Sequence, residues 1–134
     1  MKFILEHSLS PSLFEILAIL EGPAGHTVDH LRRFYPQDTK DPVWLPRLGQ
    51  DAPEVIVLTA DPRISRSPQN RAAWLESGLT IFFLRSFADL SSWEQAWRIV
   101  KWWPENVKEA SGARRGSGFL VSVSGKIEQV RSGG

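Results

Sequence analysis

The chain has 134 residues, of which 42% are hydrophobic and 23% are charged, so it has the size and composition of one globular domain and wholesale disorder is excluded. Its 16 basic and 15 acidic residues leave a net charge of +1, which singles out no class of partner. Because the sequence contains no cysteine, disulfides, thiolate metal sites and cysteine nucleophiles are excluded. The apolar run at the amino terminus is too short for a signal peptide, and no stretch approaches the ~20 apolar residues that cross a bilayer, so we expect a cytoplasmic protein with no membrane contact.

Strand and helix signals alternate along the first part of the chain. An apolar run predicts a strand over residues 2–6, and Ser10-Pro11 supplies the cap and first-turn proline of a helix over residues 12–21. The apolar residues on one face of this helix are Leu13, Ile16, Leu17 and Leu20. A weaker strand signal covers residues 26–31. Asp41-Pro42 then opens a helix that ends near Gly49, with Trp44, Leu45 and Leu48 facing inward.

The alternation continues to about residue 103. Residues 54–59 are apolar and β-branched, as in a central parallel strand, and a polar loop over residues 61–67 follows. A helix beginning at Ser67-Pro68 and ending at Gly78 precedes a strand over residues 80–84. Ser91 and Glu94 form a capping box for the next helix, which we expect to break at Pro104. The tryptophans expected to face inward are Trp44, Trp74, Trp93 and Trp97, and one of Trp102 and Trp103 is expected to be exposed.

Two strands with alternating side chains close the sequence. Residues 119–123 and 126–130, joined at Ser124-Gly125, predict a β-hairpin after a short polar helix. The whole pattern predicts a three-layer α/β/α sandwich with a central, mainly parallel sheet and this C-terminal hairpin. We expect a single domain over residues 1–131, with its core in 1–104 and an extension in 105–131, followed by a flexible tail at 132–134.

Acidic residues stand where predicted strands end or a helix begins. Glu6 and Asp61 follow apolar strands, and Asp41 opens a helix. Parallel strands deliver the residues that follow them to one crevice, where carboxylates suit Mg²⁺ or Mn²⁺. We therefore predict that Glu6, Asp41 and Asp61 are catalytic and bind one or two divalent metal ions that activate water, with Asp38 as a further candidate ligand. The alternatives are a helix cap at Asp41, a turn at Asp61-Pro62 and a surface ion pair of Glu6 with Lys2.

Three arginines follow the second strand acid. Arg63, Arg66 and Arg71 lie beside a predicted helix start, and arginine binds phosphate through two parallel hydrogen bonds. We predict that these arginines bind the phosphate backbone of RNA, although a solvated loop with local ion pairs remains the alternative.

The chain resembles the PIN-domain ribonucleases, and most closely the small PIN-like proteins grouped with toxins of bacterial toxin–antitoxin pairs. The resemblance covers roughly residues 2–104 and is carried by KFILEHSLSP (2–11), GHTVDHL (25–31), DPVWLPRL (41–48), VLTADPRI (57–64), SWEQ (92–95) and KWWP (101–104). It implies a PIN-like fold and a Mg²⁺- or Mn²⁺-dependent endoribonuclease with clustered carboxylates. It also implies an RNA substrate, an antitoxin partner and a homodimer.

Two of the three acids match this family pattern and one departs from it. Asp61 and Asp41 match acidic positions of the family, whereas Glu6 stands where aspartate is usual and His7-Ser8 where asparagine is common. A longer side chain disturbs the demanding geometry of Mg²⁺. A degenerate module that binds RNA or a protein without cleavage is therefore the main alternative. A hydrolase of small phosphoesters is a further one.

Overall fold

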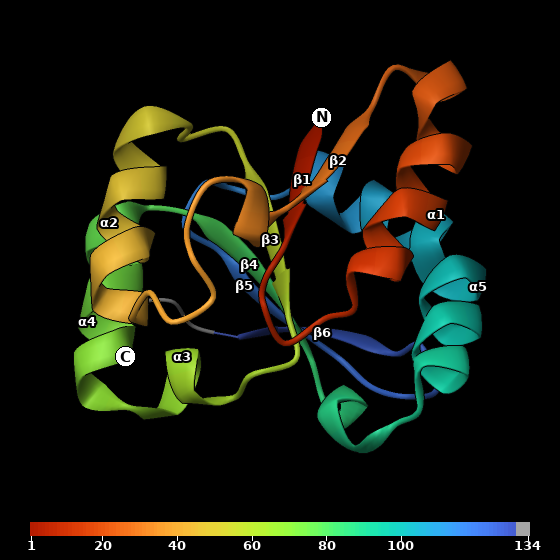
Figure 1. Cartoon of the computed structure of the whole chain (residues 1–134). Helices are drawn as coiled ribbons and strands as arrows, with labels where there is room; N and C mark the ends of the chain where they lie inside the picture. The colour runs from red at the N-terminus through yellow and green to blue at the C-terminus, as the bar shows by residue number, and fades with distance from the viewer. Residues whose placement is uncertain (131–134) are drawn as a thin grey trace.

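The computed structural model describes residues 1–130 (Figure 1). In chain order its elements are β1 (Lys2–Leu5), α1 (Pro11–Glu21), η1 (Gly22–Ala24), β2 (Thr27–His30), η2 (Leu31–Arg33), α2 (Asp41–Asp51), β3 (Ile56–Thr59), α3 (Arg63–Arg66), α4 (Pro68–Ser77), β4 (Thr80–Leu84), η3 (Phe87–Asp89), α5 (Ser92–Ser111), β5 (Gly118–Val121) and β6 (Ile127–Val130). Every predicted strand is therefore present. The predicted tail at residues 132–134 lies outside the described residues.

Six strands form one sheet in the order β2-β1-β3-β4-β5-β6. All neighbouring pairs are parallel except β5 and β6, which pair antiparallel as the predicted C-terminal hairpin. Leu5 pairs with Leu58, and Thr59 pairs with Phe83, so β1, β3 and β4 end at the same edge of the sheet. The residues that follow these three strands therefore converge at that edge.

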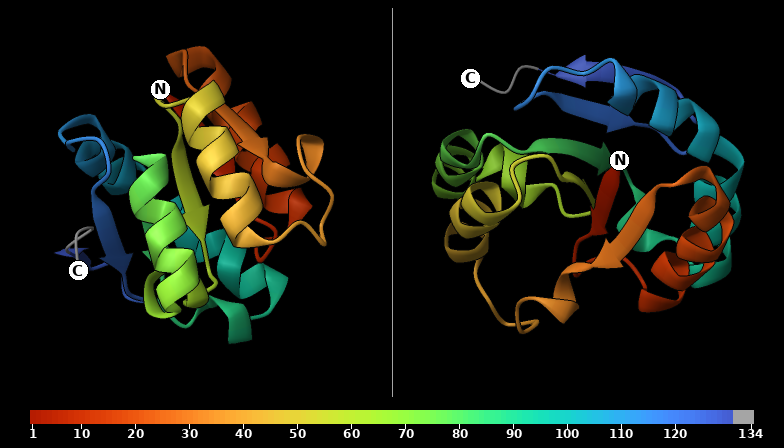
Figure 2. Two further views of the ribbon diagram at one scale, coloured as in Figure 1. Left: turned by 90° about the vertical axis from the view of Figure 1, so that its left-hand side faces the viewer. Right: turned by 90° about the horizontal axis from the view of Figure 1, so that it is seen from above.

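Helices cover both faces of the sheet, which confirms the three-layer arrangement. In Figures 1 and 2, α2 and α4 lie on one face, and α1 and α5 lie on the other. The core on the α2 and α4 side contains Trp44 and Trp74, each at most 1% exposed, as predicted. The core on the other side contains Leu13 and Leu17 of α1 and Trp103 of α5.

A close approach fixes α2 against α4. A Cβ atom at Gly49 would lie 2.2 Å from the backbone oxygen of Ser77, so only glycine allows the two helices to come this near. This packing matters for function because α2 begins with Asp41 and α4 carries Asn70. The contact therefore helps to hold the acid of α2 at the edge of the sheet.

Fewer apolar residues of α1 and α5 are buried than predicted. Trp93 is 86% exposed and Trp97 is 46% exposed, which contradicts their expected core positions. The buried positions of α5 are Gln95, Ile99, Trp103, Asn106 and Ala110, a series that places residues 93 and 97 on the opposite side of the helix. Ile16 and Leu20 of α1 are likewise exposed.

Two predictions about where helices are interrupted are wrong: the end of a helix at Pro104 and the loop over residues 61–67. Helix α5 continues through Pro104 to Ser111, since buried side chains on both sides of the proline, at Trp103 and Asn106, keep the helix packed on the core. Residues 63–66 form the one-turn helix α3 instead of a loop, because Ile64 is fully buried and anchors the segment. Within residues 1–130, no helix combines the length and the apolar character needed to cross a membrane.

Candidate functional site

The three predicted acids line one pocket of about 800 Å³ at the carboxyl edge of the sheet. Glu6 follows β1, Asp61 follows β3, and Asp41 begins α2. We call this cavity the acidic pocket, after Glu6, Asp41 and Asp61. The structure thus brings together residues that are far apart in the sequence, as their positions at strand ends predicted.

Glu6 is a buried hub of hydrogen bonds rather than a surface acid. It is 5% exposed, and Lys2 pairs with Glu54 instead, so the alternative of a Lys2–Glu6 ion pair is wrong. Its Oε1 accepts hydrogen bonds from Ser8 Oγ at 2.5 Å, from Ser8 N at 3.1 Å and from Thr59 Oγ1 at 2.7 Å. These bonds connect the end of β1 to the end of β3.

The same hydroxyl groups support the loop that carries Asp61. Ser8 Oγ accepts a hydrogen bond from the backbone N–H of Ala60 at 2.9 Å, and Thr59 Oγ1 accepts one from the backbone N–H of Asp61 at 3.0 Å. Sequence reasoning missed Ser8 and Thr59 as site residues. A signal was present, because each lies two residues from a predicted acid at a strand end.

Asp61 forms a two-point ion pair with Arg63. Arg63 Nη2 donates to Oδ2 at 2.7 Å, and Nε donates to both oxygens at 3.0 Å, while the backbone N–H of Arg63 donates to Oδ1. Burial opposes ionisation of Asp61, but the hydrogen bonds and charge of Arg63 outweigh it and hold the pKa of Asp61 below its usual value. Asp61 is therefore ionised and neutralised by Arg63.

Asp41 is in the opposite electrostatic situation. Its Oδ1 accepts a hydrogen bond from Trp44 Nε1 at 2.9 Å, and its Oδ2 accepts one from Asn70 Nδ2 at 3.0 Å. Burial, with a further contribution from the negative charges of Glu6 and Asp61, raises the pKa of Asp41. Glu6 and Asp61 are close enough to affect the pKa of Asp41, as expected for three carboxylates that line one pocket. Asp41 lies in the first turn of α2, and Lys40 occupies the cap position.

The acidic pocket contains the carboxylate oxygens that a divalent metal site requires, but these side chains are not placed so that they could bind one metal ion together. Carboxylate oxygens are the ligands that Mg²⁺ and Mn²⁺ prefer. However, no three His, Cys, Asp or Glu side chains in residues 1–130 are grouped so that they could hold a metal ion. The cation nearest to the acids is the guanidinium of Arg63, whose pKa is raised by Asp61, Asp41 and Glu6. As placed, therefore, the carboxylates do not fit a shared metal ion.

The three predicted phosphate-binding arginines are separated by the fold. Arg63 lines the acidic pocket, and its side chain is 76% exposed despite the pair with Asp61. Arg66 is exposed and lines a neighbouring pocket. Arg71 is half-buried, and its Nη1 donates to the backbone oxygen of Ser65 at 3.2 Å. Arg63 and Arg66 are thus accessible to a ligand, whereas Arg71 is less exposed and donates a hydrogen bond to the backbone of α3.

His7 and Asn70 also line the acidic pocket, as do Asp38 and Lys40. The His7 ring lies 5.9 Å from that of His30, and among the described residues its buried Nε2 has no hydrogen-bond partner. Asn70 binds Asp41 from α4, a contact that no pattern in the sequence indicates because the two residues are 29 positions apart.

A family model described as a PIN-like domain matches residues 1–86. The chain belongs to the PIN-like domain family. The match includes β1 to β4, the predicted acids Glu6, Asp41 and Asp61, and the three arginines, so it confirms the resemblance to PIN-like domains and a nuclease-type fold. No curated protein and no solved structure matches the chain.

Proposed function

We propose that this PIN-like protein is an endoribonuclease that cleaves RNA phosphodiester bonds at the acidic pocket. The observation that carries the proposal is the convergence of Glu6, Asp41 and Asp61 at the carboxyl edge of the sheet in a PIN-like domain. Ligands of parallel α/β sheets bind in the crevice at this edge. The exposed guanidinium of Arg63 beside the acids suits a negatively charged backbone.

Mg²⁺ or Mn²⁺ is the proposed cofactor, with Glu6, Asp41 and Asp61 as its ligands once Arg63 has left Asp61. A divalent cation held by these carboxylates would supply an activated water and would stabilise the leaving oxygen. This function has two conditions: Arg63 must leave Asp61, because it engages both oxygens of that carboxylate, and the three carboxylates must approach one another, because no such group within residues 1–130 is placed to hold a metal ion.

The phosphate of the RNA is the proposed alternative partner of Arg63. Guanidinium binds carboxylate and phosphate in the same bidentate way, so a substrate phosphate competes with Asp61 for Arg63. Arg66 and Arg71 are the other proposed phosphate contacts, Arg66 being the more exposed. In this scheme the substrate itself frees Asp61.

We also propose that the protein acts in the cytoplasm as the toxin of a toxin–antitoxin module, with an antitoxin as protein partner and a homodimer as its assembly. Trp102 is half-buried and Trp103 is 4% exposed, so neither is the fully exposed tryptophan predicted from the sequence, and neither offers an open ring to a partner. The aromatic surface available to a partner is instead Trp93 and Trp97 of α5.

Cleavage of a labelled single-stranded RNA by the purified protein tests the proposal. We expect products with Mn²⁺, none with EDTA, and loss of cleavage in Asp61→Asn while the circular dichroism spectrum stays that of the wild type. Equal cleavage by the wild type and a folded Asp61→Asn variant would reject the proposed site.

A second candidate function is a module that binds RNA or a protein without cutting. Two observations favour it: Arg63 neutralises Asp61, and Oε1 of Glu6 already accepts three hydrogen bonds. Calorimetric titration with Mg²⁺ and Mn²⁺ separates the two candidates. Measurable binding that disappears in Asp61→Asn supports the nuclease, and absence of binding by the wild type supports the second candidate.

A further inference from the structure

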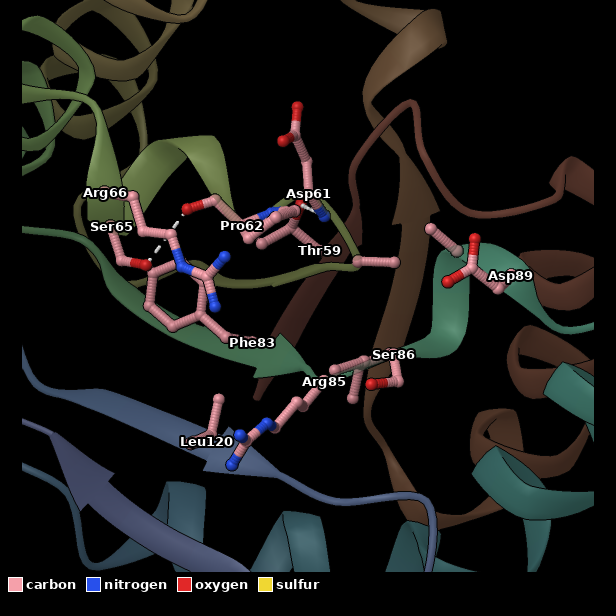
Figure 3. A pocket seen from close by; sticks show the side chains of 13 residues that line it. Thr59, Asp61, Pro62, Ser65, Arg66, Phe83, Arg85, Ser86, Asp89 and Leu120 are labelled. Atoms are coloured by element: carbon pink, nitrogen blue, oxygen red, sulfur yellow. Dashed lines mark hydrogen bonds between the residues drawn. The ribbon is translucent and has the colours of Figure 1, made fainter.

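A second pocket lies directly beside the acidic pocket. It has a volume of about 390 Å³, within the range of roughly 300–1,000 Å³ in which small-molecule sites fall. It lies where β3 and β4 end, and Asp61 is the one residue that lines both pockets (Figure 3). We call it the arginine pocket, after Arg66 and Arg85.

Two arginines from different elements border this pocket. Arg66 ends α3 and Arg85 directly follows β4, and both line the cavity whose side chains are drawn in Figure 3. Both residues are exposed, and neither guanidinium has an ion-pair partner within residues 1–130. The acids at the rim are Asp89 and Asp61, of which Asp61 is neutralised by Arg63. The pocket therefore carries a net positive charge suited to phosphate.

The wall between the arginines is apolar. Phe83 of β4 and Leu120 of β5 are paired in register and both line the cavity. Phe83 is 5% exposed and packs edge-on against Trp74, so its position is fixed, while Leu120 is half-buried. An apolar wall, exposed mainly at Leu120, beside guanidinium groups without an ion-pair partner matches the two parts of a nucleotide, its base and its phosphate.

The backbone at the rim is strained. Ser86 has φ of 65° and is the one non-glycine residue with positive φ in residues 1–130. Such strain is concentrated at ligand sites, where it fixes the direction of neighbouring side chains. Here it turns the chain sharply after Arg85, into η3.

We propose that the arginine pocket binds one nucleotide of single-stranded RNA, with its phosphate on Arg66 and Arg85 and its base against Phe83 and Leu120. This nucleotide is the neighbour of the one whose phosphodiester lies in the acidic pocket, and in this respect the inference rests on the proposed function. Arg85 becomes an RNA-binding residue that the sequence pattern did not indicate. The strand would cross the end of β3 at Asp61.

Fluorescence anisotropy of a labelled single-stranded RNA in EDTA tests the pocket without requiring cleavage. The variants are Arg66→Gln and Arg85→Gln, and the matched control is Arg47→Gln, an exposed arginine of α2 that lines neither pocket. We expect each pocket variant to weaken binding about tenfold, because a lost charge-assisted hydrogen bond has that effect, and the control to bind like the wild type. If Arg66→Gln and Arg85→Gln bind RNA as tightly as Arg47→Gln, the inference is overturned.

A second arm tests recognition of the base. In methyl NMR spectra, the Leu120 signals should shift on addition of uridine monophosphate and shift less with ribose 5-phosphate at the same concentration. Equal shifts with both probes would overturn the placement of the base.

The outcomes also separate this inference from the proposed function. If the wild type fails to cleave RNA with Mn²⁺ but Arg85→Gln still weakens binding, the nuclease proposal fails and the pocket is supported. If cleavage is intact and neither pocket arginine affects binding, the pocket inference fails alone. No RNA binding by the wild type would overturn both.

Discussion

The guanidinium of Arg63 donates two hydrogen bonds to the carboxylate of Asp61: Nη2 lies 2.7 Å from Oδ2, and Nε lies 3.0 Å from Oδ1. The pair places a positive charge beside three carboxylates, and the pKa of Asp41 is raised mainly by burial and further by the negative charges of Glu6 and Asp61. The Arg63 side chain nevertheless remains 76% exposed. The pair is therefore accessible to a competing phosphate, and it engages both oxygens of Asp61.

Removal of the arginine should increase the affinity of the acidic pocket for divalent cations. In Arg63→Gln the carboxylate of Asp61 loses its counter-ion, so we expect Mn²⁺ to bind about tenfold or more tightly than to the wild type in calorimetry. Arg47→Gln is the control for the loss of one positive charge elsewhere. Unchanged or weaker Mn²⁺ binding by Arg63→Gln would show that this arginine does not compete with metal.

Asp41 and Asp61 should affect stability in opposite directions as pH changes. The folded pKa of Asp61 is lowered, so its contribution to stability is present above its unfolded pKa of about 3.9 and is lost as pH falls through the folded value. The folded pKa of Asp41 is raised, so stability from this group is lost as pH rises from about 3.9 through the folded value.

Urea denaturation between about pH 3 and pH 6 measures both effects. Relative to the wild type, Asp41→Asn should gain stability as pH rises, and Asp61→Asn should lose it. Two curves with the same sign of slope would contradict the assigned electrostatics.

The hydroxyl of Thr59 should contribute more to the free energy of unfolding than its methyl group does. Thr59→Val removes one of the three hydrogen bonds to Glu6 Oε1, of which the two from Ser8 remain, and removes the hydroxyl that accepts from the N–H of Asp61, so we expect a loss of about 2–3 kcal/mol in the free energy of unfolding. Thr59→Ser keeps the hydroxyl and removes one buried methyl group, for a loss of about 1 kcal/mol. Similar losses in the two variants, measured by urea denaturation, would mean that the hydrogen bonds are not what holds the two strand ends together.

Glycine should be tolerated better at Ser86 than the native residue. Because Ser86 has positive φ, we expect Ser86→Gly to raise the free energy of unfolding by about 0.5–1 kcal/mol. Ser92→Gly is the contrast, since residue 92 has an ordinary helical backbone at the start of α5 and should lose about 0.5–1 kcal/mol. Loss of stability in both variants would indicate that the backbone at residue 86 is not strained.

Much of the fold was predictable from the sequence. The apolar runs ending at Leu5 and Thr59 predicted parallel strands, and these strands bring Glu6 and Asp61 to one edge. Errors arose where the pattern was ambiguous: a tryptophan signals burial by its type, but Trp93 and Trp97 lie on the outer side of α5. Ile64 similarly looked like part of a polar loop, although its burial creates α3.

The side-chain partners within the site were less predictable than its location. The position of Asp61 followed from the strand before it. The alternative of local ion pairs in the arginine segment is confirmed for Arg63, although the sequence did not specify which arginine pairs with Asp61. The contact of Asp41 with Asn70 requires α2 and α4 to pack side by side, which only the folded chain shows. The roles of the three acids in catalysis and metal binding remain predictions.

The single-turnover rate of RNA cleavage with Mn²⁺, in Asp41→Asn and Asp51→Asn, tests the central claim most directly. Both residues belong to α2, but Asp41 lines the acidic pocket and Asp51 does not. We predict a rate about a hundredfold or more below that of the wild type for a folded Asp41→Asn, and a wild-type rate for Asp51→Asn. Equal rates in the two variants would contradict a nuclease site at this pocket.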